Sequence, residues 1–332
     1  MNKHYLHLPA GVKDFLFEEA KKRRQVESTL TTLLAHYGFQ EIIPPTFEYV
    51  HSFALASRMN GESEELPEHL YRFLDRDGRL LALRSDFTAQ MARIAATRLA
   101  ELPRPIKIFY SGKVFRVEPL HAGRSREKWQ VGFEIMGQAD LQADLNTLMI
   151  VLDCLYALPI TSFRVAVGHI GYFNGLIQEA GIKNCEQIMH LKYLIERKDV
   201  ETLQHYCQEL GVPQHVNEAF VQLTRWHGSE DILEEAKQFA FRESSSKALQ
   251  DIEQLWQHIS KHPRFDRVFL DLSEVEGMGY YTGIMLKLYC AGKGQEVGSG
   301  GRYDRLVARF GCDMPAVGFS FDVDLLVQSL NL

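Results

Sequence analysis

The order of the predicted strands and helices constrains the fold of this chain more than any other feature. Two long apolar segments, 105–118 and 129–137, are joined by a polar loop and predict an antiparallel pair of strands. The segment 71–84 predicts a hairpin, because its Asp77-Gly78 pair tolerates the positive φ angles of a tight turn. Further strands are expected at 39–43, 163–167, 267–272, 284–290, 296–297 and 316–321. Helices fall between sets of strands, which is typical of an α+β fold with an antiparallel sheet flanked by helices.

Apolar periodicity predicts helices at 16–37, 88–101, 144–158 and from 322 onward. Gly38 follows the first of them and is a typical helix terminator, since glycine accepts the left-handed conformation. Between 175 and 262 the chain is polar, mostly helical and poor in strand signals. We therefore expect a core formed by 1–174 and 263–332, with 175–262 as a mostly helical inserted subdomain.

Composition narrows the classes of function. The 332 residues carry a formal net charge of −6, whereas nucleic-acid-binding domains are usually basic, so no nucleic-acid partner is expected. No apolar run approaches the ~18 residues of a membrane-spanning helix, and the first residues lack a signal peptide's apolar stretch, so no membrane partner is expected. The five cysteines are scattered and the 13 histidines show no ligand spacing. We expect reduced thiols, a cytoplasmic location, no metal and no cofactor.

The pair of long strands carries polar residues at alternate positions. Side chains alternate between the two faces of a strand, so Gln130 and Glu134 share one face of the second strand. Arg116, on the first strand, belongs to the polar face that a hairpin would present beside them. These three side chains suit a polar ligand. The alternative is an ordinary solvated face, which antiparallel sheets often have.

Two segments near predicted helix starts also admit two interpretations. In Arg84-Ser-Asp-Phe-Thr88, Asp86 and Thr88 suit a ligand ammonium, but Ser85 or Asp86 also suits a helix N-cap. Gly298–Asp304 is expected to form a turn before a helix, either to let the backbone approach a ligand or as a plain turn.

Two further segments are aromatic or basic. Tyr280 and Tyr281 stand beside glycines, a pattern that aromatic packing on a strand also explains. The loop 121–128 is basic and suits an anion, through Arg124 and Arg126, or a partner contact. A solvated hairpin tip is the alternative for this loop.

Taken in order, these segments resemble the catalytic core of the histidyl-tRNA synthetases, which have a class II aminoacyl-tRNA synthetase fold. The stretch from the first helix to Pro44-Pro45 resembles motif 1, the dimerisation element. Residues 115–134 resemble motif 2, Gly300-Gly-Arg-Tyr-Asp304 resembles a histidine-specific signature, and 315–320 resembles the start of motif 3. The resemblance runs from about residue 8 to the end and is weakest between 175 and 262.

The resemblance implies a pocket for histidine. Asp86, Thr88 and Gln130 would hold the α-ammonium group, with Tyr303 close by. Arg116 would meet the carboxylate, and Glu134 and Tyr281 would contact the imidazole.

Two departures from the synthetase pattern remove arginines that hold ATP. Glu276 stands where the family has the arginine that supports the α-phosphate. Leu325 stands where motif 3 has its arginine, and leucine donates no hydrogen bonds. A single lost donor of this kind costs about 10²–10³ in rate, so adenylation is not expected. The sequence given also ends just past the motif 3 region, so we expect no anticodon-binding domain.

The chain combines a retained histidine pocket with lost ATP contacts. In this combination it resembles one family, the regulatory subunits of ATP phosphoribosyltransferase. This resemblance implies a non-catalytic subunit in the first step of histidine biosynthesis. It would form a dimer, assemble with the short-form catalytic subunit, be needed for its activity, and mediate feedback inhibition by L-histidine. Two alternatives stay open: a truncated histidyl-tRNA synthetase-like ligase that activates an amino acid with ATP, and a stand-alone structural or histidine-sensing protein with another partner.

Overall fold

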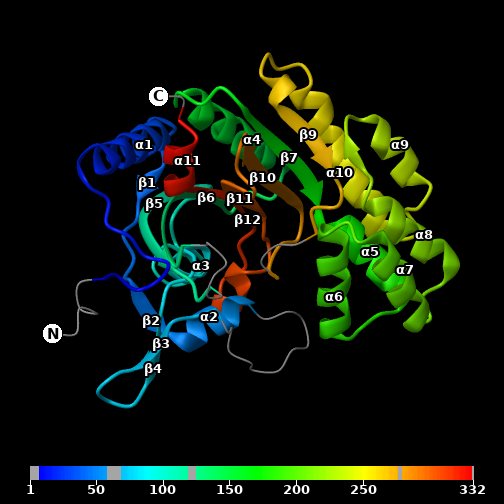
Figure 1. The fold of residues 1–332 in the computed structure, drawn as a ribbon, viewed down its shortest axis with the longest axis horizontal. Coiled ribbons are helices and arrows are strands. Elements are labelled where there is room, and N and C mark those ends of the chain that lie inside the picture. Colours follow the sequence, from blue (N-terminus) through cyan, green and yellow to red (C-terminus); the bar gives the residue numbers. More distant parts are fainter. Residues whose placement is uncertain (1–6, 58–68, 119–124, 276–278, 331–332) are drawn as a thin grey trace.

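The computed structural model describes residues 7–57, 69–118, 125–275 and 279–330 (Figure 1). Its main element is a nine-stranded sheet. In spatial order the strands are β1 (Gln40–Glu41), β5 (Ile106–Phe115), β6 (Glu127–Met136), β12 (Ala316–Asp322), β11 (Gly298–Arg302), β10 (Ile284–Cys290), β7 (Phe163–His169), β9 (Val268–Asp271) and β8 (His227–Gly228). All neighbours are antiparallel except β1 with β5 and β7 with β9. The predicted α+β class is confirmed, with a mixed and mostly antiparallel sheet.

A second, small sheet contains β2 (Phe47–Tyr49), β4 (Leu80–Leu83) and β3 (Arg72–Leu74) in that order. The predicted hairpin at 71–84 is confirmed, because β3 and β4 pair in antiparallel fashion around the Asp77-Gly78 turn. Gly78 has a backbone φ of +81°, a conformation that residues other than glycine rarely adopt.

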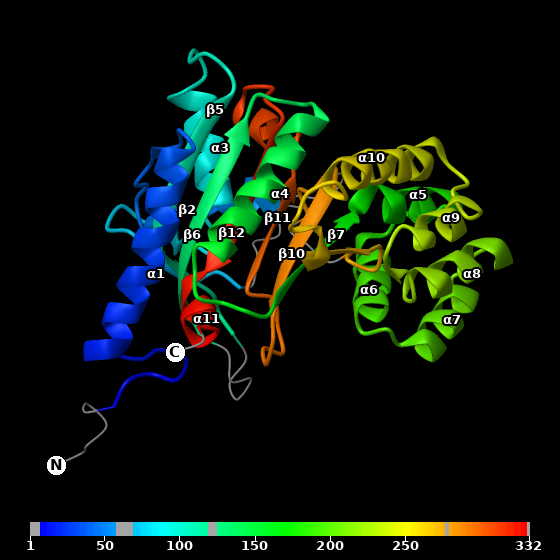
Figure 2. The ribbon, with the colours of Figure 1, turned by 90° about the horizontal axis from the view of Figure 1, so that it is seen from above.

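Helices cover both faces of the large sheet (Figure 2). α1 (Phe17–His36), α4 (Leu141–Tyr156) and α11 (Val323–Gln328) pack on one face, where Val131, Phe133 and Ile135 of β6 are fully buried. α2 (Val50–Ser57) and α3 (Thr88–Thr97) contribute to a second apolar cluster that includes Ile108 and Tyr110 of β5. Because side chains alternate along β6, Gly132 and Glu134 point away from the α1 face and toward this second cluster.

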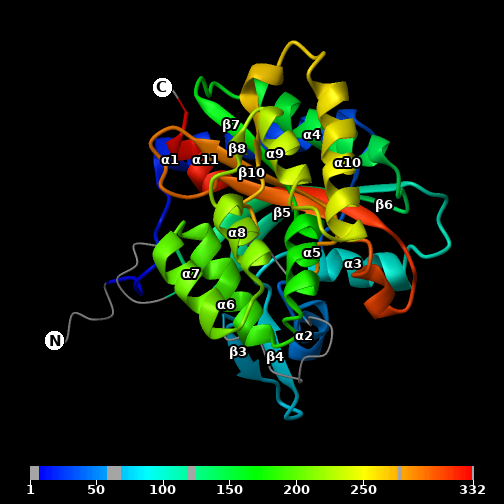
Figure 3. The same ribbon diagram turned by 90° about the vertical axis from the view of Figure 1, so that its right-hand side faces the viewer.

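The segment after β7 forms a group of helices on one side of the molecule (Figure 3). They are α5 (Ile170–Ala180), α6 (Cys185–Glu196), α7 (Val200–Glu209), α8 (Gln214–Leu223), α9 (Asp231–Lys237) and α10 (Glu243–Ile259). α10 packs against α4, α5 and β7 through an apolar stripe that includes Ala248, Ile252 and Trp256. The β8 strand of this segment pairs with β9 at the edge of the large sheet. Apolar packing is therefore continuous from the sheet into this helical segment.

The expected turn at 298–304 is wrong, because Gly298–Arg302 forms β11 between β10 and β12. The residues expected as a strand at 296–297 precede it. A Cβ on Gly300 would overlap the backbone of Gly318, and one on Gly298 would lie 2.8 Å from the Phe319 ring. Close approach of the neighbouring strand, and not a turn, accounts for these glycines. A short 3-10 turn, η3 (Val307–Phe310), follows.

Candidate ligand-binding site

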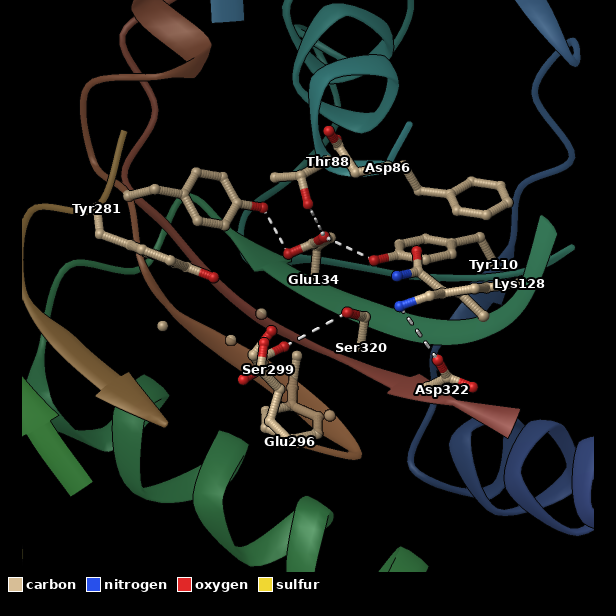
Figure 4. Close-up of a pocket in the computed structure, with 18 of the residues that line it drawn as sticks. Asp86, Thr88, Tyr110, Lys128, Glu134, Tyr281, Glu296, Ser299, Ser320 and Asp322 are labelled. Atoms are coloured by element: carbon tan, nitrogen blue, oxygen red, sulfur yellow. Dashed lines mark hydrogen bonds and ion pairs between the residues drawn. The ribbon is translucent and has the colours of Figure 1, made fainter. Parts of the chain in front are cut away.

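A pocket opens on the face of the large sheet that points away from α1, where β6, β11 and β12 meet the start of α3 (Figure 4). Its cavity volume is about 90 Å³. Seven residues predicted from the sequence line it together: Asp86, Thr88, Arg116, Gln130, Glu134, Tyr281 and Tyr303. They come from segments far apart in the chain, so tertiary folding brings them together.

Glu134 lies at the base of this pocket and is only 2% exposed. The Tyr303 hydroxyl donates a hydrogen bond to its Oε2 over 2.5 Å, and the Tyr110 hydroxyl donates to its Oε1 over 3.3 Å. Burial raises the pKa of Glu134 to about 8, although these hydrogen bonds oppose the rise. This shift favours the protonated carboxyl group near neutral pH. A cationic ligand would favour its ionised form.

Two glycines create the space around Glu134. Gly318 of β12 pairs directly with Glu134, and a Cβ on Gly318 would overlap the carboxylate. Gly132 of β6 pairs with Tyr110 of β5, and a Cβ on Gly132 would overlap the Tyr110 hydroxyl. Sequence reasoning missed Tyr110 and Gly318. An available signal was the glycine at position 132, because glycine inside a strand often marks a close approach.

Asp86 caps the start of α3 and also lines the pocket, the two roles that the sequence allowed for it. Its Oδ1 accepts a hydrogen bond from the backbone N–H of Ala89 over 3.2 Å at the start of α3. The same side chain also lines the pocket, next to Thr88. The Thr88 hydroxyl lies 3.5 Å from Oε1 of Glu134. Capping the helix and facing a ligand are therefore compatible here.

Charges of both signs line the pocket. Arg116 and Lys128 supply cations, and Glu296 and Asp322 add to the carboxylates of Asp86 and Glu134. Arg116 is held by a 2.9 Å hydrogen bond from its Nε to the carbonyl oxygen of Ser85. Lys128 lies 3.9 Å from the Asp322 carboxylate. A zwitterion can find an opposite charge for each of its ends in such a site.

Aromatic rings form another wall. The ring centroids of Tyr280 and Tyr281 are 5.1 Å apart, and those of Tyr280 and Tyr303 are 5.6 Å apart. The Tyr281 hydroxyl is directed into the pocket (Figure 4). Burial raises the pKa of Tyr281 above its ordinary value, so its hydroxyl remains a hydrogen-bond donor.

Four other predicted residues are absent from the described lining of this pocket. Arg124 and Glu276 are outside the described residues. The backbone N–H of Arg126 donates to the carbonyl oxygen of Gly11 over 2.7 Å, and its side chain is absent from the described pocket lining. Leu325 also lies outside that lining, because it packs against the core from α11.

Within the described ranges, no group of three or more histidine, cysteine or acidic side chains is arranged to hold a metal ion. In the same ranges, no helix has the length and apolar character needed to span a membrane.

Fold and sequence comparisons agree on the class of this protein. A family model described as histidyl-tRNA synthetase matches residues 11–326. The crystal structure of an ATP phosphoribosyltransferase regulatory subunit/histidyl-tRNA synthetase from Bacillus halodurans C superposes with a TM-score of 0.86 and 28% identity, covering 98% of this chain and 83% of that one. The histidyl-tRNA synthetase of Nostoc sp. PCC 7120 matches with a TM-score of 0.80 and 22% identity, covering 98% and 75%. The chain therefore has the class II fold of histidyl-tRNA synthetases.

Curated relatives identify the family more narrowly. The ATP phosphoribosyltransferase regulatory subunit of Geobacter sulfurreducens is 36% identical over 98% of this chain and 73% of its own length. The subunit of the same name from Carboxydothermus hydrogenoformans is 34% identical over 99% of this chain and 98% of its own length. The chain belongs to the family of ATP phosphoribosyltransferase regulatory subunits.

Proposed function

We propose that this chain is a regulatory subunit of an ATP phosphoribosyltransferase in the first step of histidine biosynthesis, and that it binds L-histidine in the pocket around Glu134. The observation that carries the histidine site is the convergence of seven predicted side chains on one pocket with a buried carboxyl at its base. Relatives named as such regulatory subunits support the role of the chain.

The chemistry of the pocket suits a histidine zwitterion. Asp86, Thr88 and Gln130 receive the α-ammonium group, with Tyr303 close by, and Arg116 receives the carboxylate. Glu134 and Tyr281 contact the imidazole. Each charge-assisted hydrogen bond contributes about 1.5–3 kcal/mol, and three of them support micromolar affinity after ordering costs.

The chain acts without catalysing a reaction of its own. Leu325 supports this part of the proposal, because it packs into the core from α11 and its side chain has no hydrogen-bond donor for a triphosphate. Activity then resides in the short-form catalytic subunit, which needs this chain for full activity.

Self-association as a dimer completes the proposal. Exposed apolar side chains support it: Ile43 is 81% exposed, and Phe47 and Leu74 of the small sheet are 50% and 70% exposed.

Feedback inhibition requires that histidine bind two states of the hetero-oligomer with different affinities. The complex is inhibited because histidine favours the less active state.

Calorimetric titration of L-histidine into the full chain tests the pocket. Wild type should bind with micromolar affinity, and Glu134→Gln should weaken binding at least tenfold, because an amide cannot ionise to pair with a cationic ligand. Glu101→Gln is the matched control, since Glu101 is exposed and lies outside the described pocket lining. Equal affinities in all three proteins would rule out Glu134 as a contact.

A mixing assay tests the regulatory role. The chain is added to the short-form catalytic subunit from the same organism, and phosphoribosyl-ATP formation is followed with and without histidine. Stimulation that histidine reverses is the expected result. Histidine-dependent ATP–pyrophosphate exchange by the chain alone would instead favour the ligase alternative, and the absence of both effects would overturn the proposal.

A further inference from the structure

A second and larger cavity lies between the sheet and the helical segment. Its volume is about 430 Å³. Among the described residues, its lining comes from α5, the first part of α6, the start of α10, residues 279–282 before β10, and η3 with the residues before it. Small-molecule sites typically occupy ~300–1,000 Å³ and often lie where two parts of a fold meet. The cavity thus has the size and the place of a ligand site.

The described lining residues of this cavity carry charges of one sign. Among its described lining residues the charged side chains are Lys183, Lys192, Arg305 and Arg309, with no aspartate or glutamate. The pocket around Glu134, in contrast, contains four carboxylates and two cations. Like charges that share a cavity repel one another, and an anion between them removes that repulsion.

The four cations are held to different degrees. Arg309 is anchored, because its Nη1 donates to the carbonyl oxygen of Ala56 over 2.9 Å. The Lys192 ammonium lies 5.6 Å from the centroid of the Phe173 ring. Lys183 and Arg305 are exposed and make no hydrogen bond or ion pair with another described residue. Within the described parts of the chain, the charged groups of these two side chains are therefore unpaired.

Neutral polar residues complete the lining. Asn174, Ser244 and Thr282 face the cavity from α5, α10 and the loop before β10. Cys185 also lines it, and this residue begins α6, whose N-terminal end carries a partial positive charge. The helix end favours the same sign of ligand as the four charged side chains.

We propose that this cavity binds a small molecule that carries a diphosphate group. A phosphate group carries about −1.5 to −2 near neutral pH, so two of them balance four cations. Arginine matches phosphate oxygens in a forked geometry, and lysine adds a point charge. The cavity volume of about 430 Å³ matches a small molecule better than an extended acidic surface of a protein.

The diphosphate site shares a wall with the pocket around Glu134. Tyr280 and Tyr281 line both cavities. A ligand that shifts these rings on one side changes the space on the other, which is a physical route for coupling between two sites. This coupling rests on the proposed histidine site, whereas diphosphate binding does not.

Titration calorimetry with inorganic diphosphate, on the full chain at low ionic strength and without histidine, tests the site directly. Lys183→Gln/Arg305→Gln should weaken binding at least tenfold, and Arg305→Gln alone should weaken it less. Arg225→Gln is the matched control, because Arg225 is exposed and lies outside the described lining. Added salt should weaken wild-type binding, since exposed charges are screened.

A parallel titration with ADP separates two sources of the same chemistry. Tighter binding of ADP points to a nucleotide, and equal binding points to the diphosphate group alone. No diphosphate binding by wild type, or equal weakening in Arg225→Gln, overturns the proposal. If wild type binds no diphosphate and the double variant loses its catalytic partner, the cations form a protein interface instead.

Repeating the wild-type titration with saturating histidine measures the coupling. A shift in diphosphate affinity is expected, and by reciprocity diphosphate should shift histidine affinity by the same factor. Diphosphate binding without any histidine binding would contradict the proposed function and leave the second site intact.

Discussion

The Tyr303 hydroxyl donates a 2.5 Å hydrogen bond to Oε2 of Glu134, although the two residues lie 169 positions apart in the chain. Glu134 belongs to β6 and Tyr303 follows β11, and β12 lies between these two strands. The bond can cross β12 because Gly318, the β12 residue paired with Glu134, has no side chain. Both oxygens of Glu134 thereby gain a tyrosine donor, since Tyr110 faces the other oxygen.

The ionisation of Glu134 should make the stability of the chain fall as pH rises. Burial raises its pKa from the ordinary 4.5 to about 8, so the folded chain keeps a proton that the unfolded chain has lost. This stability is fully present below about pH 4.5 and is lost as pH rises through about 8. Urea unfolding of wild type and Glu134→Gln at about pH 5 and about pH 8.5 should give a difference on the order of a few kcal/mol. Parallel pH profiles for the two proteins would contradict the assignment.

Removing the Tyr303 hydroxyl should raise the pKa of Glu134 further. The hydrogen bond from Tyr303 favours the ionised carboxylate, and Tyr303→Phe removes it while keeping the ring. Carbon-13 NMR of labelled glutamate carboxyl groups, followed against pH, measures the change. Tyr110→Phe is the matched comparison, and its effect should be smaller because its bond is longer, at 3.3 Å. An unchanged titration in Tyr303→Phe would contradict the hydrogen bond.

A methyl group at position 318 should disturb the pocket. The Cβ of Gly318→Ala would overlap the Glu134 carboxylate, so either this side chain or β12 must move. Overpacking of this kind costs about 1–3 kcal/mol, and histidine affinity should fall at least tenfold. Thermal unfolding and calorimetric titration measure both effects. Gly294→Ala is the control, because no atom lies within 4 Å of its added Cβ and Gly294 has no positive φ. If both variants unfold at the same temperature and bind histidine equally well, position 318 tolerates the methyl group.

Breaking the buried ion pair of Arg302 should destabilise the chain by about 3–5 kcal/mol. Its Nε donates to Asp144 over 3.0 Å, and its Nη1 donates to Asp304 over 3.0 Å and to the carbonyl oxygen of Gln138 over 3.2 Å. Arg302→Gln leaves Asp144 buried without its cation. Urea unfolding measures the loss.

A double variant separates this pair from general packing. Asp144→Asn in the Arg302→Gln background should recover part of the stability, because it removes the unpaired buried charge. Arg225→Gln, an exposed arginine, should change stability by no more than about 0.5 kcal/mol. A loss in Arg302→Gln no larger than that of this control would show that the ion pair contributes nothing net.

The part of the site on β6 was predictable from local pattern. Alternation along a strand places Gln130 and Glu134 on one face whatever the rest of the chain does, and Arg116 follows from the hairpin. All three line the pocket, and so do Asp86 and Thr88 from the segment before α3. Their role in binding histidine stays a prediction.

The glycine-rich segment was not predictable in the same way. Glycine permits both turns and strands, and Gly298–Arg302 has no apolar alternation to distinguish them. The glycines are required by Gly318 and Phe319 of β12, which approach them across the sheet. That requirement comes from a neighbouring strand and is invisible within the segment itself.

By itself the sequence determined the kinds of element, the hairpins and the side chains that share a strand face, because periodicity and turn chemistry depend on neighbouring residues. Only the tertiary structure decided the environment of those side chains. The pKa of Glu134 rises because β5, β6, β12 and the tyrosine after β11 enclose it together. Tertiary folding likewise brings four cationic side chains into one cavity, although they are spread between residues 183 and 309. Burial and electrostatic potential are sums over residues that are distant in the chain, so they exist only once the chain has folded.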